Sequence, residues 1–181
     1  YGPTAPQTEA EIETFLMMME YYFDRMFKGD KKILFLMTAD HGMCEIDPQT
    51  TTYLNTNPNF SGFERFLKSN RKNELLVPAG SPRDMFLYIK DEMLDEAQSF
   101  LSARLAGRAD VVKTETLIKE GYFGTDVSAR FKERVANLVV LSYRYESVWW
   151  YEKDKYIQRY YGHHGGLTPQ EMETILYSYE I

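Results

Sequence analysis

Two histidine-glycine segments hold the residues of this 181-residue chain that are best suited to bind a metal ion. The DHG segment, within "MTADHGM", contains Asp40, His41 and Gly42 and directly follows an apolar run. The HHGG segment, within "YYGHHGGLTP", contains His163 and His164, so the two segments hold every histidine of the chain. Catalytic zinc sites use imidazole nitrogen and carboxylate oxygen at about 2.0 to 2.2 Å, which requires side chains that converge. We therefore expect the two segments to be halves of one metal site.

A plainer interpretation of the same residues stays open. An Asp that follows a strand is often a turn or helix-capping residue, and a His-Gly pair is common. Asp40, His41 and one of His163 or His164 also give only three ligands, which are too few for a site with two metal ions. The glycine next to each segment's histidine favours the metal interpretation, because glycine allows a sharp backbone turn and leaves room for a ligand to approach.

The composition narrows the classes of partner. A formal net charge of -6 argues against binding of a nucleic-acid polymer, which needs clustered Lys and Arg to neutralise phosphates. No apolar run of the sequence approaches the roughly 20 residues of a transmembrane helix, and there is no signal-peptide pattern. The single cysteine, Cys44, cannot form an intramolecular disulfide. We expect a soluble, cytoplasmic protein with no membrane partner.

The residues before the DHG segment predict a helix and a buried strand. Apolar residues recur with helical spacing over residues 12–27, and Thr8 with Glu11 has the sequence of a capping box. Residues 33–37 form the short, unbroken apolar run of a strand that is buried on both faces. A helix followed by such a strand indicates an α/β layer with a parallel sheet. Ligands of such sheets gather beyond the carboxyl ends of the strands, where the DHG segment lies.

The middle of the chain predicts a small β-α-β unit. We expect a strand at residues 85–89, then a helix within "DEMLDEAQSFLSARLAG" that Gly107 terminates, then a second strand and a short helix. This unit is expected to be a cap or subdomain inserted between the two segments. The chain then divides into a core α/β segment with the DHG corner at residues 1–77, the cap at 78–125, and a return to the core with the HHGG corner at 126–181.

The last part of the chain predicts two further strands and a short helix. "NLVVLSY" is the clearest strand, and "TILYSYEI" is expected to close the chain. Between them, Thr168 and Glu171 have the spacing of a second capping box, with Pro169 at the first helical position. A helix is therefore expected directly after the HHGG segment.

Six motifs occur in a characteristic order along the chain: "TADHGM", "TTTYLN", "GSPRDMFLY", "GYFG", "RVANLVVL" and "HHGGLTPQEME". In this order they resemble the C-terminal part of the nucleotide pyrophosphatase/phosphodiesterase branch of the alkaline phosphatase superfamily. The resemblance implies an α/β fold, namely the C-terminal part of a doubly wound alkaline-phosphatase-like core with a small inserted α+β subdomain. It also implies two divalent metal ions, usually zinc and alternatively manganese, at the carboxyl ends of the strands.

The resemblance assigns the metal ligands as well. Asp40 and His41 match the family's ligands of one metal ion, His164 matches a ligand of the other, and His163 has no assigned role. The family also takes an Asp and a His for the second ion from an upstream D-x-x-x-H motif, which a Y-G-P-like segment follows closely. Because this chain opens with "YGPTAP" at Tyr1 instead of a methionine, we expect it to begin just after those ligands.

The nucleophile of the family is a Thr or Ser that lies further upstream still. Thr38, Thr51 and Thr52 are near the DHG corner, but none matches the nucleophile's context. We therefore assign no catalytic residue within the chain. The chain by itself is expected to be inactive and to bind metal weakly or not at all.

The intact parent is expected to be a metal-dependent hydrolase of phosphodiester or phosphoanhydride bonds, with a phosphate ester or nucleotide as substrate. One alternative is a phosphomutase or phosphomonoesterase of the same superfamily. Another is a catalytically silent binding domain, in which the two segments are structural turns. A core that lacks half of its sheet should also expose apolar surface, so a homodimer through this surface is a further expectation.

Overall fold

The computed structural model describes residues 1–27 and 32–180. Its α-helices are α1 (Pro6–Met26), α2 (Leu94–Arg104), α3 (Thr114–Lys119), α4 (Ala129–Arg134) and α5 (Pro169–Met172). The 3-10 helices are η1 (Pro48–Thr50), η2 (Pro58–Phe60), η3 (Phe63–Phe66) and η4 (Asp91–Met93). The strands are β1 (Leu34–Thr38), β2 (Cys44–Glu45), β3 (Thr52–Tyr53), β4 (Ala79–Gly80), β5 (Asp84–Leu87), β6 (Ala109–Lys113), β7 (Leu138–Ser142), β8 (Val148–Trp149), β9 (Gly162–His163) and β10 (Leu176–Glu180).

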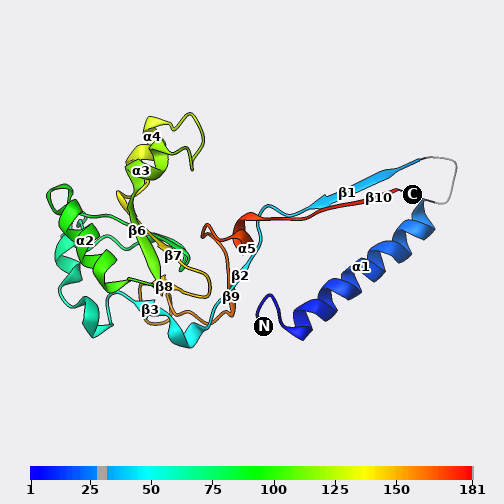
Figure 1. Ribbon diagram of the computed structural model, residues 1–181, viewed down its shortest axis with the longest axis horizontal. Helices are drawn as coiled ribbons and strands as arrows, with labels where there is room; N and C mark the ends of the chain where they lie inside the picture. Colours follow the sequence, from blue (N-terminus) through cyan, green and yellow to red (C-terminus); the bar gives the residue numbers. More distant parts are fainter. Residues whose placement is uncertain (28–31, 181) are drawn as a thin grey trace.

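The molecule has a compact part and an arm (Figure 1). The compact part contains β3 to β8 and α2 to α4, and the arm contains α1, β1 and β10. The short pair β2 and β9 connects them, and α5 lies between them. The DHG and HHGG segments both belong to this connection, because one directly precedes β2 and the other ends β9 and runs on toward α5.

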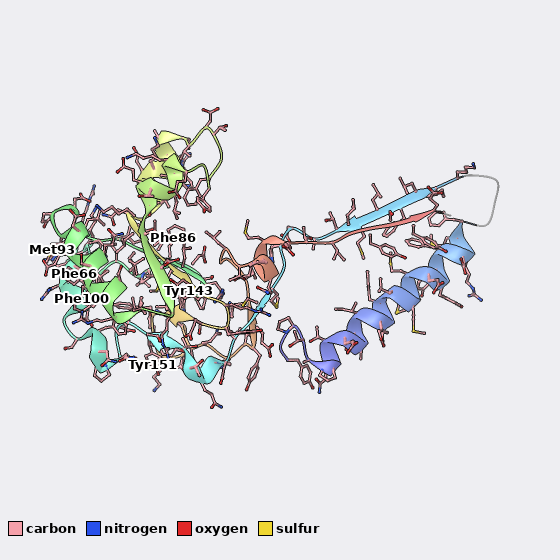
Figure 2. The ribbon with its side chains drawn as sticks, viewed as in Figure 1. Phe66, Phe86, Met93, Phe100, Tyr143 and Tyr151 are labelled. Carbon is pink, nitrogen blue, oxygen red and sulfur yellow. The ribbon has the colours of Figure 1, made fainter. Side chains whose placement is uncertain are left out.

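A four-stranded antiparallel sheet forms the centre of the compact part, in the order β4-β5-β7-β6. Most residues of β7 are buried, as its unbroken apolar sequence predicts for a central strand. The core beside this sheet includes Phe63, Phe66, Leu101 and Leu138. Phe66 and Phe100 lie together in it, with ring centroids 5.3 Å apart (Figure 2).

This sheet spans the boundary that we predicted at residue 125. β5 and β6 belong to the predicted cap, whereas β7 belongs to the predicted return to the core and pairs with both of them. The helix expected after β5 is present as η4 and α2, and Gly107 follows it in the left-handed conformation at φ 78°. The division of the chain into three segments stays a prediction.

The arm is a helix laid along a two-stranded antiparallel ribbon. Phe35 of β1 lies opposite Tyr179 of β10. Phe23 of α1 packs on both rings, with centroids 4.6 Å from Phe35 and 6.3 Å from Tyr179. On the other face of β1, Leu34 and Leu36 are 58% and 57% exposed. None of the residues of α1 is buried.

Two predictions about this region are wrong. β1 is not buried on both faces of a parallel sheet, because β10 is its only strand partner in the described residues, runs antiparallel, and no layer covers the face away from α1. Thr8 does not cap α1, because the helix begins at Pro6, two residues before it, and Ala5 is the N-cap. The Thr8 hydroxyl donates instead to the carbonyl of Gly2 at 2.8 Å.

In the described part of the chain, no helix combines the length and the apolar character that crossing a membrane requires.

Candidate functional site

The DHG segment follows the carboxyl end of β1 and is fastened to α5. The amide of Gly42 donates to the backbone carbonyl of Glu171 at 2.8 Å. A side chain at Gly42 would place its Cβ only 2.1 Å from the carbonyl oxygen of Gln170. Glycine is therefore required here so that the backbone can lie against α5.

The two predicted corners meet face to face. The imidazoles of His41 and His164 are stacked, with ring centroids 3.8 Å apart and an interplanar angle of 16°. Asp40 Oδ1 lies 3.7 Å from His41 Nε2. Asp40, His41 and His164 thus lie at one place on the surface, where the Asp40 side chain is 91% exposed. The metal role of these residues stays a prediction.

The hydrogen bonding of His41 leaves one ring nitrogen free for a ligand. Nδ1 lies 2.7 Å from the carbonyl oxygen of Gly42. A carbonyl can only accept, so Nδ1 carries the proton and Nε2 of the neutral ring has a free lone pair. A backbone carbonyl on the far nitrogen is a common arrangement for a histidine that binds metal.

The distance between Asp40 and His41 fits a shared ion. Two ligand atoms that each lie about 2.1 Å from a tetrahedral ion are about 3.4 Å apart. The 3.7 Å between Asp40 Oδ1 and His41 Nε2 is close to this spacing. Across residues 1–27 and 32–180, however, no group of three or more His, Cys, Asp or Glu side chains is arranged to hold a metal ion. The residues present therefore fit part of a metal site, with further donors needed to complete it.

His163 contacts other groups of the protein. It ends β9 and lies opposite Cys44 of β2, and its Nε2 is 3.0 Å from the side-chain oxygen of Gln158. Burial lowers the pKa of His163, and the nearby charges of His164 and Arg83 lower it further. Its Nε2 is thus engaged by the protein.

The sequence did not reveal the buried ion pair next to the site. Arg83, which precedes β5, and Glu171 of α5 form a bidentate pair with N–O distances of 2.8 and 2.9 Å. Their side chains are 0% and 1% exposed. Both residues stand in motifs that carry the family resemblance, "GSPRDMFLY" and "HHGGLTPQEME", and Glu171 was also expected in a capping box, but neither signal indicated that the two residues pair.

The second predicted capping box is correct in position, but neither of its two hydrogen bonds from side chain to backbone amide forms. Thr168 is the N-cap of α5 and Pro169 begins the helix, as predicted. Glu171 does not return to the N-cap amide; its carboxylate accepts from Arg83, from the Gly166 amide at 3.0 Å and from the Thr168 hydroxyl at 2.6 Å. Burial alone would raise the pKa of Glu171, but these hydrogen bonds and the charge of Arg83 together hold it below the usual range.

The glycines of the HHGG segment accommodate protein groups and not a ligand, which corrects our interpretation of them. A Cβ at Gly165 would lie 2.6 Å from Asp84 Oδ1 and 2.7 Å from Ser81 Oγ. A Cβ at Gly166 would lie 2.7 Å from Glu171 Oε2.

The Asp84 carboxylate that lies against Gly165 is itself perturbed. Burial raises the pKa of Asp84, although hydrogen bonds from Ser81 oppose the shift.

Comparison with protein-family models and with curated proteins gives no match. Among solved structures, human ectonucleotide pyrophosphatase/phosphodiesterase 5 is similar at a TM-score of 0.61 and 15% identity, over 98% of this chain and 42% of that one. An inactive variant of the murine protein, in complex with AMP, gives 0.59 and 16%, over 97% and 42%. Phosphonoacetate hydrolase from Sinorhizobium meliloti 1021, in complex with phosphonoformate, gives 0.59 and 16%, over 98% and 42%.

These likenesses establish the fold. The chain spans 42% of the length of each of these structures and has the α/β fold of the matching part of an alkaline-phosphatase-like core. The fold implied by the sequence resemblance is thereby confirmed.

Proposed function

We propose that this chain provides part of the metal site of a phosphodiesterase or nucleotide pyrophosphatase that hydrolyses phosphodiester or phosphoanhydride bonds. Asp40 and His41 are ligands of one divalent ion, and His164 is a ligand of a second, with zinc or alternatively manganese as the metal. The observation that carries the proposal is the stacking of His41 on His164 beside Asp40.

The geometry of the stack supports two ions better than one. The lone pairs of an imidazole lie in the plane of its ring, so parallel rings direct their nitrogens along parallel planes and not toward a common point. The ring centroids are 3.8 Å apart, and catalytic metal pairs are separated by about 3.5 to 4 Å. Each ring is thus suited to its own ion of a pair.

The choice of bond rests on the structural neighbours. Two of the three are ectonucleotide pyrophosphatases/phosphodiesterases, one of them bound to AMP, and the third is a phosphonoacetate hydrolase. A phosphate ester or nucleotide therefore remains the proposed substrate class, ahead of a phosphomutase or phosphomonoesterase reaction. A silent binding domain is disfavoured because its structural turns would have no reason to bring two exposed imidazoles together.

The residues of this chain act by binding and orienting. Metal ions bound here would polarise the phosphoryl oxygens and lower the pKa of an attacking hydroxyl or water. Asp40, His41 and His164 are assigned as ligands and not as general acids or bases. In the neutral ring of His41 the carbonyl of Gly42 fixes the tautomer, so that the lone pair is on Nε2.

Titration with Zn²⁺, followed by imidazole ¹H–¹⁵N spectra, tests the ligand assignment. Ring signals of His41 and His164 are expected to shift as Zn²⁺ is raised to millimolar concentration, even where binding is weak. His163 is the internal control and should stay unchanged, because Gln158 engages its Nε2. Unchanged His41 and His164 signals, or an equal response of His163, would rule out the proposed ligands.

The chain alone is expected to hydrolyse bis-p-nitrophenyl phosphate no faster than buffer does, because none of its residues is assigned as nucleophile. A colorimetric assay with Zn²⁺ and with Mn²⁺ checks this prediction. Robust turnover that His164→Ala abolishes would show that the nucleophile lies within this chain. The cytoplasmic location expected from the sequence also stays a prediction.

A further inference from the structure

The Arg83–Glu171 pair is buried as completely as the apolar core. Its side chains are 0% and 1% exposed, and in every other ion pair of residues 1–27 and 32–180 both partners are more than a quarter exposed. Burial of two charges is unfavourable unless their hydrogen bonds are complete. Here they are: Arg83 Nη1 donates to the carbonyls of Tyr143 and Glu146, while its Nε and Nη2 bind the carboxylate.

Glu171 holds both histidine segments at once. Its carboxylate accepts from the amide of Gly166, two residues after His164. Its backbone carbonyl accepts from the amide of Gly42, the residue after His41. One residue therefore contacts the chain on the C-terminal side of each stacked imidazole.

The turn that contains Arg83 supports the HHGG segment from the other side. Ser81 Oγ lies 3.0 Å from the carbonyl oxygen of His164 and 2.5 Å from Asp84 Oδ1. The same two side chains fill the space that a Cβ at Gly165 would need. His164 is thus fixed against the turn between β4 and β5, at the edge of the central sheet.

Apolar burial cannot fix the stacked rings, because His41 and His164 are both exposed. The elements around them are short as well: β9 has two residues and α5 has four. Buried hydrogen bonds of Glu171 to Arg83 and to Gly166, and an exposed one between Ser81 and the His164 carbonyl, connect these rings to the compact part.

We propose that Arg83 and Glu171 are positioning residues that set the His41–His164 stack, by fixing both segments to the sheet of the compact part. Arginine is required because its planar fork binds both carboxylate oxygens while its third nitrogen binds two carbonyls, which the single ammonium of lysine cannot reproduce. The value of this positioning for metal binding rests on the proposed function. The claim about the stack itself does not.

Aromatic ¹H–¹³C spectra of the purified chain measure the stack directly. Each ring lies in the other's ring current, so the ring protons of His41 should move downfield when His164 is replaced by Ala, and the reverse. Arg83→Lys and Glu171→Gln are expected to cause the same downfield movement at both histidines, while the signals of His163 change less. If replacing either histidine by Ala left the ring protons of the other unchanged, the rings would not be stacked in solution and the proposal would be overturned.

A stability-matched control separates positioning from general destabilisation. Leu105 directly follows α2 and is fully buried in the hydrophobic core. Leu105→Ala is expected to lower the unfolding midpoint at least as much as Arg83→Lys but to leave the stacking shifts in place. If Leu105→Ala also abolished them, or if Arg83→Lys left them intact, the pair would have no positioning role.

Milder variants carry the test if Arg83→Lys does not fold. Ser81→Ala removes the hydroxyl from the His164 carbonyl, and Thr168→Val removes the hydroxyl from Glu171 Oε2. Each should cause a smaller downfield movement of the His164 ring protons, and unchanged signals in both would overturn the proposal. A stack that depends on Arg83 but does not respond to Zn²⁺ would refute the proposed function and leave the positioning role standing.

Discussion

Glycine at position 42 is required by a contact with protein and not by a special backbone angle. The nearest atom to a Cβ built there is the Gln170 carbonyl oxygen at 2.1 Å, which belongs to backbone and cannot rotate away. Gly42→Ala should therefore destabilise the chain by about 1–3 kcal/mol, as overpacking does. Urea unfolding followed by tryptophan fluorescence measures this change.

The matched control for Gly42→Ala is Gly62→Ala. Gly62 has a left-handed φ of 82° and nothing within 4 Å of its Cβ position, so alanine there causes backbone strain of about 1–2 kcal/mol without a clash. Of the two variants, Gly42→Ala should also disturb the imidazole signals of His41, because the amide of Gly42 is hydrogen-bonded to Glu171 of α5. Undisturbed signals would mean that the backbone moves aside at little cost.

The ionisation of Glu171 should make its contribution to stability depend on pH. Its folded pKa lies below the ordinary value of 4.5, so the stabilisation is complete above about pH 4.5 and is lost as pH falls through the lower, folded pKa. Glu171→Gln is expected to cost about 3–5 kcal/mol at pH 7, because it leaves Arg83 as an uncompensated buried charge. The difference from wild type should shrink as pH falls below 4.5.

Urea unfolding of both proteins from pH 7 to pH 3 checks this prediction. Asp84 and His163 also feel the charge of Glu171, so the quantity to compare is the wild-type minus variant difference. Glu173→Gln is the control: its side chain is exposed, and the change should stay within about 0.5 kcal/mol at each pH. A pH-independent cost for Glu171→Gln would show that its charge contributes nothing.

The residue types that bear chemistry could be predicted from the sequence, whereas the residues that support them could not. The chain's few histidines and its DHG pattern single out Asp40, His41 and one of His163 or His164, and the family resemblance selects His164. Arg83 and Glu171 are ordinary charged residues in the sequence, and only the fold shows that they are buried and paired. An ion pair between residues that are far apart in the sequence does not change the local pattern of apolar residues, so composition and spacing could not reveal it.

Two strands with similar apolar sequences differ in what covers them. β7, predicted from "NLVVLSY", lies between β5 and β6 and is buried, whereas β1, predicted from "ILFLM", has β10 on one edge and is exposed on one face. An apolar run says that a strand requires cover, but it does not say which element provides it. This is why the strand at 33–37 was predicted correctly and its burial was not.

The burial of β7 predicts that truncation of a valine in it costs more than truncation of an exposed valine. Val140 in β7 is 0% exposed, and Val140→Ala should cost about 2 kcal/mol, from lost transfer free energy and the cavity that remains. Val77, outside the strands, is 43% exposed, and Val77→Ala should change the free energy of unfolding by less than about 0.5 kcal/mol. Denaturant unfolding compares the two; equal costs would contradict the central place of β7.

At the scale of the whole molecule, apolar surface concentrates on the arm. Leu34, Leu36 and Leu176 of the ribbon are exposed, as are several apolar and aromatic residues of α1, namely Ile12, Phe15, Met17, Met18, Tyr21, Tyr22 and Met26. A cavity of about 200 Å³ also lies between α1 and the ribbon, lined by residues that include Leu16, Phe23 and Met37. Apolar patches of this kind mark surfaces that bind another protein.

A second copy of the chain is the partner that this surface predicts. β1 has no strand partner on its outer edge among residues 1–27 and 32–180, so its backbone groups are free to pair with β1 of another molecule. Such pairing about a two-fold axis would extend the ribbon into a four-stranded sheet and would place the exposed leucines of both copies side by side on one face. We expect the chain to form dimers whose fraction rises with concentration.

Light scattering after size exclusion, over a range of protein concentrations, measures the dimer. Leu36→Lys should shift the chain toward monomer, because it would replace an apolar contact between neighbouring strands of the paired sheet with lysines that repel each other. Tyr122→Lys is the matched control, since Tyr122 is 56% exposed but lies in the compact part, and it should leave association unchanged. If both variants weakened association equally, general surface hydrophobicity would explain it and not β1. A wild-type chain that stays monomeric at every concentration would show that α1 and the ribbon cover each other well enough in solution.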